Sequence, residues 1–168
     1  MNSTIDASDF AQLADFWKRA PEITKEELLI AVTDSDVLLQ GELMQALPSG
    51  AGGAAGLRGS IFHEEQVLAD NVLGMTSTDK QYAPFIELGT RPHLPPITPL
   101  IDWVEAKLGL HGAEAKSAAF AISRKIGKHG TRPNPVWRTV WQAQQTAIRR
   151  KFDEAMQRIA SRLAGGAA

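Results

Sequence analysis

Apolar residues recur every three to four positions over most of the chain, which is the spacing of helices with one buried face. Residues 8–19 show this pattern, and Pro21 is predicted to end that helix. A second helix is expected to begin at Thr24, because Thr24 and Glu27 have the spacing of a capping box, and to end at Pro48. Its apolar stripe comprises Leu28, Val32, Leu39, Leu43 and Leu47.

The pattern changes between residues 57 and 88. Short runs of β-forming residues at 60–62, 66–68 and 72–75 are separated by polar breaks. The segment YAPFIEL, residues 82–88, has the character of a further short strand, and its proline favours a sheet edge. We therefore expect a small antiparallel sheet.

Helical spacing returns in the C-terminal half. One helix is predicted from Thr98-Pro99 to Gly109, and another over residues 113–127. The second is expected to bury Ala119, Phe120, Ile122 and Ile126. A long C-terminal helix is predicted to start at Asn134-Pro135 and to run to about residue 163. Its stripe would comprise Trp137, Trp141, Ile148, Phe152, Ile159 and Leu163.

These elements predict an α+β fold in which a small antiparallel sheet packs with long amphipathic helices. The length of 168 residues suits one domain, residues 1–164. Within it, residues 1–22 would form an N-terminal helical arm, and the glycine- and alanine-rich residues 48–56 a flexible loop. Residues 165–168 are expected to be a disordered tail.

Composition narrows the functional classes. The chain has no cysteine, which excludes disulfides and thiolate chemistry. Its N-terminus lacks the features of a signal peptide, and no apolar run approaches the length that spans a bilayer, so no membrane partner is expected. The net charge of −1 hides an asymmetry: residues 124–162 contain ten Lys or Arg and two acids. That distribution suggests either contacts between copies of opposite charge or a basic face for nucleic acid.

The residues that could take part in catalysis form no recognised catalytic or metal-binding motif. The four histidines have no metal-ligand spacing, and the motifs of zinc, calcium and phosphate-loop sites are absent. His63-Glu64-Glu65 is a weak acid–base candidate, because neighbouring strand residues point to opposite faces. We expect no enzyme activity, catalytic residue, cofactor or metal. The tryptophans are expected to pack in a core or an interface rather than to stack on bases.

One run of motifs resembles the neck and tail-component proteins of long-tailed bacteriophages. It begins with Gly-Leu-Arg-Gly-Ser-Ile at residues 56–61, and its central motif is YAPFIELGT at residues 82–90. A proline-rich turn and a helix follow, and then AAFAISRKIGKHGTRPNPVW, residues 118–137. The resemblance covers roughly residues 25–145. The segment between the two GTRP motifs is larger than the family pattern, which leaves the exact place in the neck open.

The resemblance implies a virion structural protein: a neck or tail-completion subunit that joins the head connector to the tail. Such subunits form homo-oligomeric rings, here of six or twelve copies, around the DNA channel, and they contact other neck, connector and tail-tube proteins. The expected location is the virion neck or tail, after assembly in the host cytoplasm. Two alternatives remain: a nucleic-acid-binding protein that uses the basic C-terminal half, and a small hydrolase that uses the histidines and the glycine-rich loop.

The tetrapeptide GTRP occurs at residues 89–92 and again at residues 130–133. Each copy is predicted to be a turn that ends one element before a second proline starts a helix. Their arginines are expected to lie exposed at subunit contacts, and Glu87 is expected to pair with Arg91 or with an arginine of a neighbouring subunit. The predicted interface residues are Tyr82, Phe85, Glu87, Arg91, Arg132, Trp137 and Trp141.

Overall fold

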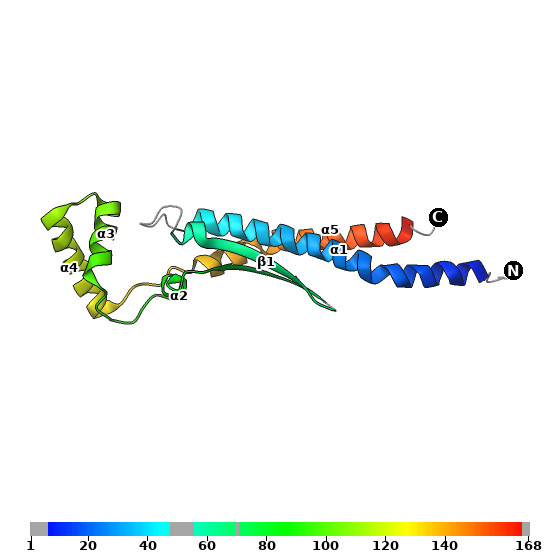
Figure 1. Cartoon of the computed structure of the whole chain (residues 1–168), viewed down its shortest axis with the longest axis horizontal. Helices are drawn as coiled ribbons and strands as arrows, with labels where there is room; N and C mark the ends of the chain where they lie inside the picture. Colours follow the sequence, from blue (N-terminus) through cyan, green and yellow to red (C-terminus); the bar gives the residue numbers. More distant parts are fainter. Residues whose placement is uncertain (1–6, 48–55, 70, 166–168) are drawn as a thin grey trace. The chain divides into compact units, whose positions relative to one another are not determined.

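The computed structural model describes residues 7–47, 56–69 and 71–165, and confirms the α+β class (Figure 1). Within these ranges, two strands form an antiparallel hairpin and the remaining elements are helical. In chain order the elements are α1 (Ala7–Ala46), a 3-10 turn η2 (Arg58–Ser60), β1 (Ile61–Val67), β2 (Val72–Thr78), α2 (Ala83–Leu88), α3 (Ile97–Leu108), α4 (Gly112–His129) and α5 (Val136–Gly165).

Helix α1 is continuous, so the predicted break at Pro21 is wrong. A proline inside a helix removes one hydrogen bond and costs about 3 kcal/mol. Pro21 itself is exposed, and the helix continues through it to the buried Ile23 two residues later. Thr24 and Glu27 are therefore mid-helix residues and do not form a capping box.

The expected runs of β residues merge into two strands, but the predicted third strand is a helix. Residues 83–88 form α2, with Pro84 in its first turn, where the missing N–H is not needed. Ala83 and Ile86 face the core, whereas Phe85 and Leu88 are exposed. This three-residue spacing is helical, and six residues were too few to reveal it in the sequence.

Contacts group the chain into two compact units. The first comprises residues 1–38, 63–76 and 144–168; the second comprises residues 39–62 and 77–143. Helices α1 and α5 and both strands contribute residues to each unit. The expected loop at 48–56 and the expected tail at 165–168 lie outside the described residues, apart from Gly56 and Gly165.

In the first unit, α1 and α5 run antiparallel and are joined by ion pairs (Figure 1). Arg158 Nε donates to Glu27 Oε2 at 2.6 Å, and Arg162 Nη1 donates to Glu27 Oε1 at 3.0 Å. Arg162 also bonds Glu26 at 2.7 Å, and Lys151 Nζ lies 3.9 Å from Asp34 Oδ2. Basic groups of the C-terminal helix thus meet acidic groups of the same chain.

Glu27 is 95% buried, and hydrogen bonds from Arg158 and then Arg162 hold the pKa of its carboxyl below the ordinary value. The same pairing with Glu26 and Glu27 raises the pKa of Arg162. A carboxyl with a lowered pKa stabilises the fold above the unfolded pKa, about 4.3 for glutamate. That contribution is lost as the pH falls through the lowered value in the folded state.

The second unit has two apolar clusters. One joins the end of α1, the η2–β1 segment, α2 and the start of α5 through Leu43, Leu47, Leu57, Ile61, Ala83, Val136 and Val140. The other joins α3 to α4 through Val104, Ala115 and Ala119, where small side chains let the helices approach closely. The left-handed Gly109 ends α3, as predicted. Helix α3 begins at Ile97, so Thr98 lies inside it rather than at its cap.

The predicted apolar stripes of α4 and α5 are partly displaced. On α5 the buried positions are Val136, Val140, Ala155 and Ile159, so the predicted stripe is confirmed at Ile159, whereas Trp141 is half exposed. On α4 the buried positions are Ala115, Ala119 and Ser123, while Phe120 is exposed. In both cases small or β-branched residues take the tightly packed positions and the large aromatic rings remain at the surface.

Asp36 is a buried carboxyl in the first unit. It accepts a hydrogen bond at 3.1 Å from the Thr76 hydroxyl, and its Oδ2 has no partner among the described residues. Gly74 makes this packing feasible, since a Cβ there would overlap Asp36 and Val32. Burial raises the pKa of Asp36, and the negative charge of Glu65 adds to the increase.

We predict that Asp36→Asn raises the free energy of unfolding at pH 7 by about 1 kcal/mol, because it removes the desolvation of an incompletely paired carboxylate. Since the folded pKa is raised, the gain shrinks as the pH falls below that value and vanishes below the unfolded pKa of about 3.9. Urea unfolding at several pH values measures this. The exposed Asp34→Asn is the control, and a less stable Asp36→Asn variant at pH 7 would contradict the prediction.

Candidate assembly site at the paired GTRP corners

The two GTRP motifs pair with each other, which the sequence analysis did not anticipate. Thr90 and Thr131 form an isolated antiparallel β-bridge with two backbone hydrogen bonds of 3.2 Å. The hydroxyl of Thr131 also donates to the hydroxyl of Thr90 at 3.1 Å, and its N–H is shared with the same oxygen. We call residues 89–92 and 130–133, joined in this way, the clasp. It closes the chain around α3 and α4.

Glycine is required at both ends of the clasp. Gly89 has φ 72° and ψ −177°, and Gly130 has φ 68° and ψ −161°, a region that is nearly confined to glycine. A Cβ on Gly89 would overlap backbone atoms of Thr131 and Pro133, and one on Gly130 would overlap the backbone of Thr90. The repeated glycine therefore provides both the backbone conformation and the close approach.

Glu87 connects α2 to the start of α5. Its two carboxylate oxygens accept hydrogen bonds from the N–H groups of Trp137 and Arg138, at 3.0 and 3.1 Å. Free N–H groups at a helix start attract a negative charge, so Glu87 caps α5 from fifty residues away. Ile86 O accepts the N–H of Asn134 at 2.9 Å and supports the same junction. Glu87 was expected to pair with Arg91 or with an arginine of a neighbouring subunit; within the described chain its hydrogen-bond partners are the N–H groups at the α5 start.

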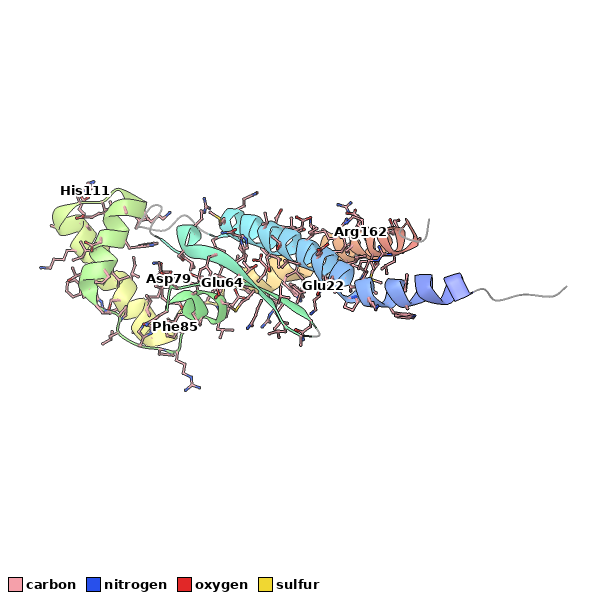
Figure 2. The ribbon with its side chains drawn as sticks, turned by 45° about the vertical axis from the view of Figure 1, so that its right-hand side comes forward. Glu22, Glu64, Asp79, Phe85, His111 and Arg162 are labelled. Atoms are coloured by element: carbon pink, nitrogen blue, oxygen red, sulfur yellow. The ribbon has the colours of Figure 1, made fainter. Side chains whose placement is uncertain are left out.

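A hollow of about 630 Å³ lies on the outer side of α2 and the first half of the clasp. Its lining is mainly apolar, with Arg91 and His93 at its polar margin. Phe85 and Leu88 expose 60% and 64% of their surface beside it, and Figure 2 shows Phe85 on the ribbon of α2. The lining residues are Pro84, Phe85, Leu88, Gly89, Thr90, Arg91, Pro92 and His93.

The structure brings most of the predicted interface residues to this region. Tyr82 lies directly before α2, Phe85 and Glu87 lie on it, and the clasp contains Arg91 and Arg132. Trp137 is joined to Glu87 and packs partly against the core, so it is not a free surface residue. Trp141 lies one turn further along α5 and is exposed.

Sequence reasoning missed Pro84 and Leu88 as parts of the hollow. A strand would have placed Phe85 on the opposite face from both of them, whereas a helix places all three on one side. Pro84 and the three-residue spacing of Ala83 and Ile86 are compatible with a helix, but a run of six residues does not decide between helix and strand.

The described residues give little support for a metal site or for a membrane-spanning helix. Their histidine, aspartate and glutamate side chains form no group of three that could hold a metal ion. No helix in that part of the chain is long and apolar enough to cross a membrane. His63 and Glu65 approach to 3.7 Å on β1, and Glu64, which is labelled in Figure 2, lies on the same strand.

Comparison of this chain with protein-family models, with curated proteins and with solved structures gives no match. Any functional argument therefore depends on the chain's own residues.

We predict that Gly89→Ala and Gly130→Ala each lower the free energy of unfolding by about 3 kcal/mol, because each combines backbone strain with an overlap across the clasp. Gly109→Ala is the matched control: its φ of 65° is also positive, but no atom lies within 4 Å of a Cβ there. It should cost about 1 kcal/mol. Equal losses for all three in chemical unfolding would show that the clasp adds nothing.

We predict that Glu87→Ala lowers the free energy of unfolding by about 1 kcal/mol through loss of the α5 cap. Glu87→Gln should lose less, since one carbonyl oxygen remains to accept a hydrogen bond. The exposed Asp102→Ala serves as the control. This differs from the sequence-based expectation, in which Glu87 acts in assembly more than in folding; unchanged stability with impaired assembly would favour that earlier hypothesis.

Proposed function

We propose that this chain is a virion structural protein, the ring-forming neck or tail-completion subunit of a tailed bacteriophage. The motif order from residue 56 to residue 137 supports the phage assignment, and the exposed apolar surface supports assembly. The observation that carries the proposal is the hollow beside α2, where Phe85 and Leu88 are solvated on a backbone fixed by the clasp.

The number of exposed apolar residues favours a protein that functions in an assembly. Among the described residues, seventeen large hydrophobic side chains are exposed. Scattered exposure is normal, but apolar residues gathered around a hollow are typical of a contact surface. A rigid surface also loses little conformational entropy on binding.

We assign the hollow to a second copy of the chain. A suitable counterpart is the outer face of the hairpin, where Leu73 and Met75 are half exposed. Their neighbours Gly74 and Thr76 face Asp36 on α1, so the alternation of the strand turns Leu73 and Met75 away from it. Two different patches in contact make a heterologous interface, which generates a ring if the rotation closes.

Complementation between two variants tests this interface. Phe85→Glu should prevent assembly by placing a charge in the hollow, and Met75→Glu should prevent it by charging the opposite patch. Each variant keeps one intact patch, so an equimolar mixture should form heterodimers and no larger species. Light scattering after size-exclusion chromatography measures the masses. Phe120→Glu, at an exposed aromatic residue outside both patches, is the control and should assemble like the parent chain.

Electron microscopy tests the function itself. We expect rings of six or twelve copies from the concentrated protein, and antibody labelling at the neck or tail of particles that contain it. Homodimers formed equally by both variants would overturn the heterologous interface while leaving the phage assignment open. A chain that is monomeric at every concentration and absent from particles would overturn the proposed function.

A further inference from the structure

The structure divides the basic residues of the C-terminal half into two groups. On α5, Arg158, Arg162 and Lys151 pair with acids of α1, and Arg150 lies 3.7 Å from Glu154. A second group lies at the end of α4 and in the clasp, within the second unit. Among the described residues, no ion pair involves any member of this group. It comprises Arg91, Arg124, Lys125, Lys128 and Arg132, and we call it the clasp cation patch.

Acidic residues are absent from the sequence around most of this patch. Between residues 115 and 152 the chain has nine Lys or Arg and no Asp or Glu. All five patch residues are exposed. Because α4 buries Ala115, Ala119 and Ser123, the positions of Arg124, Lys125 and Lys128 fall on its opposite, solvated side. Their charges are therefore accessible to a ligand.

Local packing holds the patch together. The N–H of His93 donates to the carbonyl oxygen of Ile126 at 3.4 Å, and Leu94 lies so close to Gly127 that a Cβ there would overlap it. These contacts fix the segment after Arg91 to the last turns of α4. The bridge between Thr90 and Thr131 fixes the segment before Arg132 to the same place.

We propose that the clasp cation patch binds the phosphate backbone of double-stranded DNA, without sequence specificity. Duplex DNA carries one negative charge per about 1.7 Å of its axis, so a compact group of cations can neutralise several phosphates together. Three of the five side chains are arginines, whose planar guanidinium groups match phosphate oxygens in a bidentate geometry. Their fixed backbone lowers the entropic cost of binding.

Duplex DNA suits the patch better than an acidic protein surface. A protein partner would normally present charges of both signs, whereas duplex DNA presents a regular array of negative charges. The five patch residues all carry positive charge, which is typical of phosphate-backbone contacts. The proposal does not depend on ring formation, because all five residues belong to one unit of one chain.

Salt-dependent binding of a 30-base-pair duplex by the free chain tests this proposal. If five cations each neutralise one phosphate, the logarithm of the affinity should fall with the logarithm of salt concentration with a slope of about −4.5. Affinity would then decrease about 500-fold between 50 and 200 mM salt. Fluorescence anisotropy with a labelled duplex of random sequence measures this slope. The assembly variant Met75→Glu, whose substitution lies on the hairpin and outside the unit that holds the patch, should bind in the same way, which separates this result from ring formation.

Two triple variants with the same change of charge locate the contact. Changing Lys125, Lys128 and Arg132 to Gln should reduce the magnitude of the slope by about 3. Changing Lys116, Arg149 and Arg150 to Gln removes the same charge from the same acid-free stretch and should leave the slope unchanged. Circular dichroism and thermal unfolding of both variants confirm that the fold is retained.

Four results would overturn the proposal. These are a slope near zero in the parent chain, equal slopes for the two triple variants, and tighter binding of a single strand than of the duplex. The fourth is a patch variant that loses self-association while the parent chain binds no DNA, which would make the patch a contact between copies.

Discussion

The pairing of Thr90 with Thr131 is the constraint on which the second unit depends. It brings together segments forty-one residues apart and fixes three junctions: the end of α2, the return of α4 and the approach to α5. Glu87 reaches the first N–H groups of α5 at a junction that this pairing, the Asn134–Ile86 hydrogen bond and the first apolar cluster all hold. Gly89 and Gly130 make the pairing sterically feasible, and each has a backbone conformation that other residues rarely adopt.

Much of the architecture was predictable because glycine and proline act locally. The boundaries at Gly109 and near Pro135 follow from backbone conformations that the sequence specifies directly. Pro21 and residues 82–88 were misassigned because neither one proline nor a six-residue run decides its element alone: α1 continues past Pro21, and residues 83–88 form a helix with Ala83 and Ile86 at the core. The clasp itself was not predicted, although two identical tetrapeptides can pair antiparallel as easily as they can form separate turns.

At the candidate site, too, some features were predictable from the sequence and others were not. Phe85 and Arg91 were selected from their motif and line one hollow, whereas the role of Glu87 depends on a contact fifty residues distant. The opposite charges of the two halves of the chain were detected in the composition, but composition does not show which charges meet. Antiparallel packing of α1 and α5 pairs several basic residues of α5 with acidic residues of α1. The basic residues at the end of α4 remain available to a ligand.

The clasp also has a consequence for the architecture of the chain. Because residues 90 and 131 are hydrogen-bonded to each other, the polypeptide leaves and re-enters the rest of the second unit at one point. Helices α3 and α4 have their own apolar cluster, and none of their residues belongs to the cluster that joins α1, α2 and α5. The segment between the two halves of the clasp therefore forms an excursion with a separate core. Related chains can therefore shorten, lengthen or replace this excursion while retaining the remainder, since loop-closure entropy changes only slowly with length. The clasp, which closes this excursion, is then the part of the sequence where steric overlap most restricts substitution.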